Sequence, residues 1–235
     1  MKHYFIGIVL LLCSNSLYAE DFFPPPFTAT YTLYAKGFSV GEGTRTLSHR
    51  KDGKWVFDTF AQTTGFVGFF KKISITERSI FTKDNGKIRP LKYIYKQKGL
   101  KPRTNILSFY WSRKQARNTF NKQTKMIALK RGTLDRLLYQ IKLMQDLKQG
   151  KRYLSYRIAD KGKLKIYTPH LLGNERIDTG LGELNTIKYE RRSSNSKRRT
   201  IFWCAPTLHY LPVQVEHVEK NGDVFRLVLQ SVKGL

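Results

Sequence analysis

The chain has 235 residues, with 43 lysines and arginines against 17 aspartates and glutamates, a formal charge of +26. Such an excess of positive charge predicts attraction to polyanions. No hydrophobic run reaches the length of about 20 residues that a membrane-spanning helix needs, so no helical anchor is expected.

The first 19 residues are predicted to be a secretory signal peptide. Lys2 gives the chain a basic N-terminal region, and an apolar run of about ten residues follows from Tyr4 to Cys13. Cleavage after Ala19 is the favoured interpretation, and residues 14–16 offer a second site. The sequence therefore predicts an exported protein.

Cysteine use agrees with a soluble periplasmic protein. Cys13 could suggest a lipid anchor, but Leu12 is too bulky for the small residue expected before a lipidated cysteine. Cleavage would remove Lys2 and no acidic residue, which leaves 42 basic and 17 acidic side chains and a charge of +25. Cys204 would then be the only cysteine, so stability must come from a core and not from an intramolecular disulfide.

The mature chain is expected to begin with an extended lead-in, residues 20–27, that contains three consecutive prolines. Residues 28–235 are expected to form a single β-rich domain. Asp52-Gly53, Asn85-Gly86 and Asn221-Gly222 each separate alternating apolar and polar stretches, a pattern typical of tight β-hairpins. About a dozen strands of this kind are predicted, mostly joined by short turns.

One segment has helical spacing instead. Thr133 is a suitable N-cap, Lys148 lies in the last turn and Gly150 is a stop. The apolar stripe consists of Leu134, Leu137, Leu138, Ile141, Met144 and Leu147. A lone amphipathic helix must bury its apolar face against the strands. The expected fold is mainly β: one curved antiparallel sheet, a half-open β-barrel, that clasps one α-helix.

Several stretches occur in this order along the chain: YTLYAKGFSVGEGTRTL, TTGFVGFFKK, RPLKYIYKQKG, the helix, GNERIDTGLGELNTIKYE and FWCAPTLHYLPVQVEH. Together they resemble the DUF3108 family of uncharacterised exported proteins, over nearly the whole mature chain. The last stretch is also similar to the closing hairpin of LolA/LolB-like and RseB-like periplasmic proteins. That likeness implies a half-open barrel with a helix in its mouth and a cavity for acyl chains. Neither resemblance brings catalytic residues, and Cys204 departs from the acidic or polar residue expected at its position.

A ligand pocket between sheet and helix is one hypothesis. Trp203 is interpreted first as a core plug and second as a ligand contact, and Cys204 as an inert apolar residue. Residues 65–72, GFVGFFKK, are interpreted first as a connection that roofs the core and second as a loop that enters a membrane interface. The pocket candidates are Phe66, Phe69, Phe70, Leu137, Ile141, Met144 and Trp203.

Basic residues could surround the head group of such a ligand. The stretch RRSSNSKRR has small polar residues between two predicted strands, so it is interpreted as a solvated hairpin tip first and as a weak anion-docking site second. It lacks the aromatic residues of a single-stranded nucleic-acid site, so no nucleic acid is expected. The rim candidates are Lys71, Lys72, Arg191, Arg192, Lys197, Arg198 and Arg199.

Other chemistry finds little support in the sequence. The pair Cys204 and His209 has no second close pair to complete a metal site, and no cofactor motif is present. No nucleophile elbow, phosphate-binding glycine loop or His-Glu-x-x-His occurs, so no enzyme is expected, and an enzyme with an unrecognised site ranks third among the interpretations.

The sequence therefore favours a non-catalytic periplasmic binding protein for an amphipathic anion, such as a lipid or another anionic envelope component, with peripheral membrane contact as an option. The rival is an interaction protein with a filled core that docks to lipopolysaccharide, cell-wall polymer or an acidic envelope protein. The two differ in whether the interior is hollow.

Overall fold

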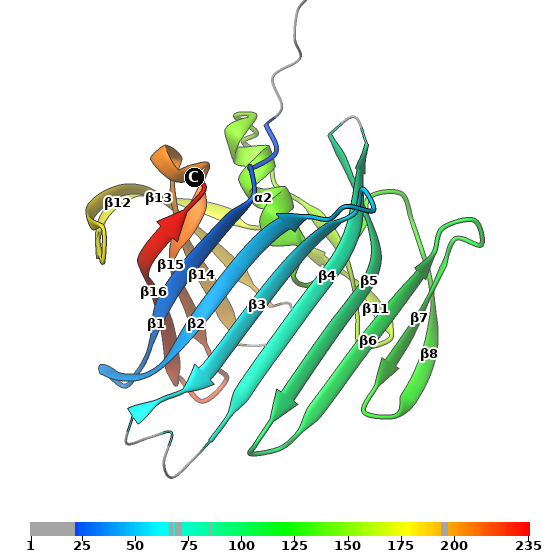
Figure 1. Cartoon of the computed structure of the whole chain (residues 1–235), viewed down its shortest axis with the longest axis horizontal. Helices are drawn as coiled ribbons and strands as arrows, with labels where there is room; N and C mark the ends of the chain where they lie inside the picture. Colours follow the sequence, from blue (N-terminus) through cyan, green and yellow to red (C-terminus); the bar gives the residue numbers. More distant parts are fainter. Residues whose placement is uncertain (1–21, 66–67, 69–71, 85, 194–196) are drawn as a thin grey trace, which may run out of the picture.

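Sixteen strands, helix α2 and a short 3-10 turn are formed by the described residues in the computed structural model (Figure 1). The structure describes residues 22–65, 68, 72–84, 86–193 and 197–235, so the predicted signal peptide lies outside it. In chain order the elements are β1 (Phe27–Ala35), β2 (Phe38–His49), β3 (Trp55–Thr63), β4 (Ser74–Asp84), β5 (Lys87–Lys98), β6 (Arg103–Tyr110), β7 (Gln115–Phe120), β8 (Gln123–Ala128), β9 (Thr133–Asp135), α2 (Tyr139–Lys148), β10 (Tyr156–Asp160), β11 (Lys163–Tyr167), β12 (His170–Thr179), β13 (Gly182–Arg192), β14 (Arg199–Ala205), η1 (Pro206–Leu208), β15 (Leu211–Val218) and β16 (Val224–Lys233).

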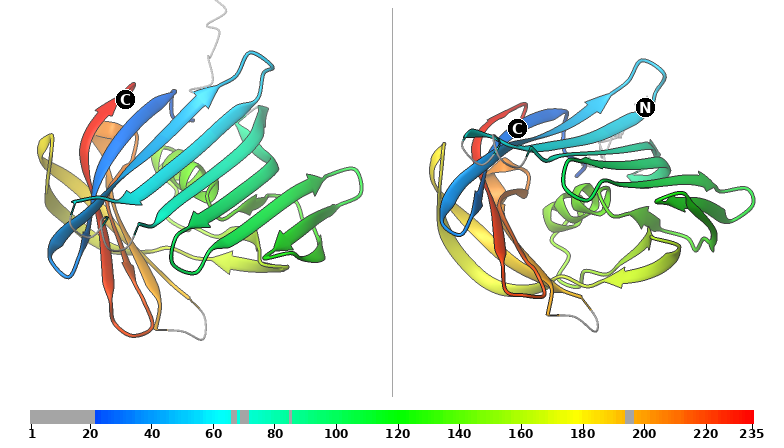
Figure 2. Two further views of the ribbon diagram at one scale, coloured as in Figure 1. Left: turned by 60° about the horizontal axis from the view of Figure 1, so that its bottom comes forward. Right: turned by 90° about the horizontal axis from the view of Figure 1, so that it is seen from below.

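Thirteen strands form one antiparallel sheet in the order β12-β13-β14-β15-β16-β1-β2-β3-β4-β5-β6-β7-β8. Its end strands, β12 and β8, do not pair with each other, so the sheet curves around α2 without closing (Figure 2). Strands β11, β10 and β9 add a small second sheet, in which β9 runs parallel to β10. The prediction of a mainly-β, half-open barrel that clasps one helix is confirmed, and the small sheet is an addition to it.

The core lies between the concave face of the large sheet, the small sheet and α2. Buried and exposed side chains alternate along β5, and this alternation shows how the sequence produces the core. Tyr93 is fully buried, while its neighbour Lys92 is exposed. The buried face continues across neighbouring strands with Phe57, Phe81 and Leu107, none more than 2% exposed. Burying apolar area of this kind is the main stabilising contribution to such a fold.

The helix begins later than predicted, and this prediction was wrong for residues 133–138. Thr133 does not cap a helix but starts strand β9, which pairs with Arg157 and its neighbours in β10. Asp135 then turns the chain, because its Oδ1 accepts hydrogen bonds from the Leu137 and Leu138 amides at 2.9 and 2.7 Å. The predicted end is confirmed: α2 stops at Lys148, before Gly150 at φ +71°.

Buried polar groups tie the small sheet to the large one. The Asn105 amide in β6 donates to the Asp160 carboxylate of β10 at 3.1 Å, and Lys165 pairs with that carboxylate at 2.7 Å. The Asn118 amide of β7 donates to the Asn105 side-chain oxygen, and its own oxygen accepts from the Gly162 amide, both at 2.5 Å. These satisfied groups fix how the small sheet sits on β6 and β7, because unpaired buried groups are costly.

Hairpin turns alternate between two edges of the large sheet. The predicted turns at Asp52-Gly53 and Asn221-Gly222 are confirmed, whereas Asn85 lies outside the described residues. We call the edge with residues 50–54, 86 and 111–114 the helix edge, because Gln145 of α2 donates there to the Gly86 carbonyl at 2.9 Å. We call the opposite edge, with residues 36–38 and 98–101, the tip edge (Figure 1).

Strands β1 and β16, which come from the two ends of the described chain, pair with each other. They pair antiparallel from Thr28, opposite Lys233, to Ala35, opposite Phe225. The first and last strands along the chain, β1 and β16, therefore lie side by side in the interior of the large sheet.

Candidate functional site

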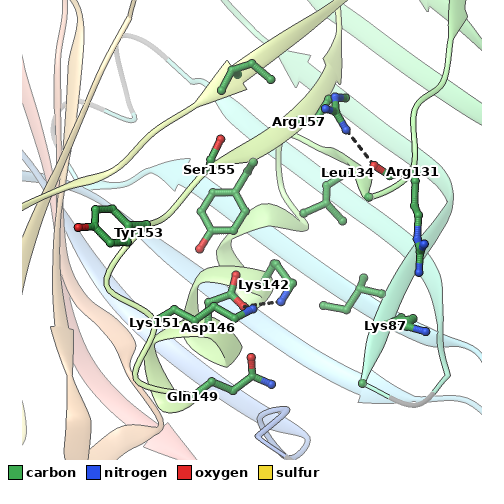
Figure 3. A pocket seen from close by; sticks show the side chains of 15 residues that line it. Lys87, Arg131, Leu134, Lys142, Asp146, Gln149, Lys151, Tyr153, Ser155 and Arg157 are labelled. Carbon is green, nitrogen blue, oxygen red and sulfur yellow. Dashed lines mark hydrogen bonds and ion pairs between the residues drawn. The ribbon is translucent and has the colours of Figure 1, made fainter.

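Two adjoining cavities form a groove at the helix edge. Their volumes are about 570 and 550 Å³, and they share Lys87, Ile88, Arg131 and Gly132. The walls come from the start of β5, the connection before β9, the outer face of α2 and the start of β10 (Figure 3). Cavities of this size are in the range of small-molecule sites.

Apolar side chains form part of the groove surface. Ile88, Leu129 and Leu134 are buried at its base, and Tyr153 and Ile166 remain 96% and 58% exposed at its mouth. Large apolar side chains left open beside a concavity are typical of surfaces that contact a ligand.

Positive charge surrounds these apolar residues. The two cavities are lined by eight cationic and two acidic side chains, a formal charge of +6; the cations are Lys87, Arg89, Lys114, Lys130, Arg131, Lys142, Lys151 and Arg157. Concave surfaces with one sign of charge focus the field and concentrate counter-ions.

The two walls differ in how far their charge is neutralised. On the α2 side, Lys142 and Lys151 both bond Asp146 Oδ1 at 2.5 Å (Figure 3). Burial lowers the pKa of Lys142, and the Asp146 carboxylate opposes that shift. On the other wall, Lys87 and Arg131 have no ion-pair partner among the described side chains. More charge is therefore available to a ligand on the wall with Lys87 and Arg131 than at Lys142 and Lys151.

The wall behind these two cations is fixed in place. Trp111 Nε1 donates to the Pro90 carbonyl at 2.7 Å, and the Arg89 guanidinium lies 5.2 Å from the centre of the Trp111 ring. Arg157 Nη1 donates to the Arg131 carbonyl at 2.9 Å, which links the β10 side to the same wall. The groove is thus largely formed before any ligand arrives.

The predicted pocket residues lie elsewhere. Leu137, Ile141, Met144 and Trp203 are 0–3% exposed and belong to the packed core, and none of them lines the groove. Phe66, Phe69 and Phe70 lie outside the described residues. Leu134, predicted only as part of the helix stripe, does reach the groove. The groove residues that the sequence missed are cations far apart along the chain.

The predicted rim cations also lie away from the groove. Arg191 stacks over Tyr167 at 4.2 Å, and Lys72 is exposed before β4. A separate cavity of about 490 Å³ is lined by Arg192, Lys197, Arg198 and Arg199 together with the β15–β16 turn. Carboxylates already pair several of these cations: Glu190 with Arg192 at 2.5 Å, and Glu219 with Arg198 at 2.7 Å. Lys71 is not among the described residues.

Metal-ligating side chains do not gather anywhere in the part of the chain that the structure describes; no three of His, Cys, Asp and Glu come together there. None of the described helices has the length and apolar character needed to cross a bilayer.

We expect the Cys204 thiol to resist modification in the folded protein. It is fully buried, and burial raises its pKa to about 12, so the reactive thiolate is scarce at neutral pH. A chain without residues 1–19 contains no other cysteine. A maleimide should therefore label it only in denaturant, and equal labelling rates in the native and unfolded states would contradict this.

Fold and groove together define a β-barrel-like protein with a cationic surface groove. The chain belongs to the DUF3108 family, proteins of unknown function, whose match covers residues 30–230. No curated protein matches the chain.

One of three similar solved structures supports the fold. A β-barrel-like protein of the DUF1849 domain family from Brucella abortus superposes with a TM-score of 0.57 at 9% identity, over 89% of this chain and 98% of that one. A candidate lipoprotein from Parabacteroides distasonis gives a TM-score of 0.34 at 14% identity, over 90% and 98%. A candidate exported protein with a YmcC-like fold from Bacteroides fragilis gives 0.36 at 12%, over 91% and 99%. The expected likeness to LolA/LolB-like and RseB-like proteins is not confirmed.

Proposed function

We propose that this chain is a non-catalytic periplasmic binding protein that holds an amphipathic anion in the groove at the helix edge. The observation that carries the proposal is the pairing of unneutralised cations, Lys87 and Arg131, with apolar groove residues such as Ile88 and Ile166. A head group with negative charge would meet the cations, and an alkyl chain would cover the apolar surface. An acidic lipid has this chemistry, and so have other acyl-bearing anions of the envelope.

The groove replaces the interior as the proposed binding place. The described core between α2 and the sheet is filled by side chains such as Leu137 and Ile141. A ligand at the helix edge requires no opening of that core. This arrangement combines the filled interior of the rival interpretation with the ligand of the favoured one.

Dodecyl phosphate is a direct probe of this proposal. We expect calorimetric titration to show binding, with Lys87→Gln and Arg131→Gln together weakening it by about tenfold to a hundredfold, as expected for lost bonds to a charged group. The matched control is Lys51→Gln with Lys163→Gln, two exposed lysines outside the groove.

Two further ligands separate the contributions of the groove. Dodecanol carries the chain without the charge, and inorganic phosphate carries the charge without the chain. Each should bind more weakly than dodecyl phosphate. Unchanged affinity in the groove double variant, or equal loss in the control, would disprove the assignment.

A further inference from the structure

Exposed apolar side chains stand at the tip edge, at the opposite end of the sheet from the groove. Phe38 starts β2 and is 75% exposed, and Leu100 lies in the β5–β6 turn and is 60% exposed. Phe225 in β16, whose register partner is Ala35 of the β1–β2 hairpin, is 42% exposed. None of these three side chains is buried, so packing in the core does not account for the apolar residues at these positions.

Contacts along the sheet place these residues on one continuous edge. The Thr64 amide, after β3, donates to the Val40 carbonyl near the start of β2. A Cβ on Gly99 in the β5–β6 turn would lie 2.0 Å from the Lys72 carbonyl oxygen, so that turn touches the start of β4. The ends of four neighbouring strands, β2 to β5, therefore lie together at this edge. At the usual strand spacing, β2 and β5 are about 15 Å apart.

Cations are interleaved with the apolar tips. Among the described residues, the exposed basic side chains at the ends of β2 to β6 are Lys36, Lys72, Lys98, Lys101 and Arg103. The nearest acidic residue along β2, Glu42, already accepts a hydrogen bond from Gln62 at 2.7 Å. In the part of the edge that the structure describes, exposed apolar side chains thus stand among positive charges.

We propose that the tip edge docks this protein onto an anionic membrane surface, with Phe38 and Leu100 entering the interface and the neighbouring lysines meeting the lipid head groups. A stable protein interface needs a contiguous apolar centre of several hundred Å². The exposed apolar side chains described at this edge are separate from one another, and a fluid lipid layer can surround each of them. Amphipathic surfaces of this kind combine apolar burial with attraction to anionic lipids. Strand β5 runs from Lys87 in the groove to Lys98 at this edge, so the groove would open roughly 35 Å away from the docked edge.

Sedimentation with vesicles of phosphatidylcholine, with and without phosphatidylglycerol, tests the proposal. The protein is expected to bind only when phosphatidylglycerol is present. Phe38→Ser with Leu100→Ser should weaken binding by about tenfold or more, from the lost apolar burial. Lys36→Asn with Lys101→Asn should weaken it by about tenfold, and asparagine suits their positive φ angles of 51° and 54°.

Leu181→Ser is the matched control, because this leucine is 45% exposed in the β12–β13 turn, away from the tip edge. Its binding should equal that of the unmodified protein. Vesicle binding that survives Phe38→Ser with Leu100→Ser would overturn the proposal and indicate adhesion by charge alone. Loss of binding in the Leu181→Ser control would overturn it as well. Phe38→Ser with Leu100→Ser should leave dodecyl phosphate binding unchanged, because neither residue lines the groove, so docking and groove binding can fail independently.

Discussion

Replacing Asp135 with alanine is expected to destabilise the fold by about 3 kcal/mol, because the buried Leu137 and Leu138 amides would lose the carboxylate that accepts their hydrogen bonds. The carboxylate is fully buried and also accepts a hydrogen bond from the Ser79 hydroxyl at 2.5 Å. It therefore joins β4, β9 and the start of α2. Chemical denaturation measures the loss, and Asp178→Asn at an exposed position is the control, with an expected effect within about 0.5 kcal/mol.

Asparagine at the same position separates charge from geometry. Burial raises the pKa of Asp135 from 3.8 to about 6, although its hydrogen bonds act in the opposite direction. The folded state thus holds the proton more tightly than the unfolded state, so this contribution to stability is present below pH 3.8 and is lost as the pH rises through 6.

Asp135→Asn keeps an acceptor for the amides and cannot ionise. Its stability relative to the unmodified protein should therefore rise by about 2 kcal/mol between pH 4 and pH 7. Denaturation curves across that range are the measurement. A difference between the two proteins that stays constant with pH would contradict a raised pKa at Asp135.

Replacing Ile141 with alanine is expected to cost about 2–5 kcal/mol of unfolding free energy. Ile141 faces the sheet from α2 and is 0% exposed, so truncation leaves a cavity in a packed core. The matched control is Ile166→Ala in the groove, where the side chain is 58% exposed and the cost should stay below about 1 kcal/mol.

This comparison also decides between a filled and a hollow interior. If the space between α2 and the sheet held a ligand cavity, Ile141 would border open volume and its truncation would cost little. A cost below about 1 kcal/mol for Ile141→Ala would restore the predicted interior pocket. The cost expected for a packed site would leave the groove as the place for a ligand.

Local patterns were enough to predict most of the fold. The alternation around Tyr93 and the turn at Asp52-Gly53 depend on neighbouring residues, and both follow from strand geometry. The start of the helix did not follow, because Thr133 pairs with Arg157 in a parallel strand that comes later in the chain. Helical spacing alone could not reveal that tertiary contact.

The groove was beyond prediction for a related reason. Lys87, Arg131 and Lys151 are far apart in the sequence, and none stands in a motif. The sequence drew attention to the densest cluster of cations, Arg191 to Arg199, where Glu190 and Glu219 already neutralise part of the charge. Density along the chain is a poor guide to charge that remains available after folding.

The pairing of β1 with β16 has a consequence for the order in which this protein folds. Thr28 and Lys233 are separated by almost the entire described chain, yet they are neighbours at the centre of the sheet. Loop closure over such a distance is slow, so folding can finish only after the last strand has arrived. Because synthesis starts at the N-terminus, β1 would keep one unpaired edge until β16 has been made.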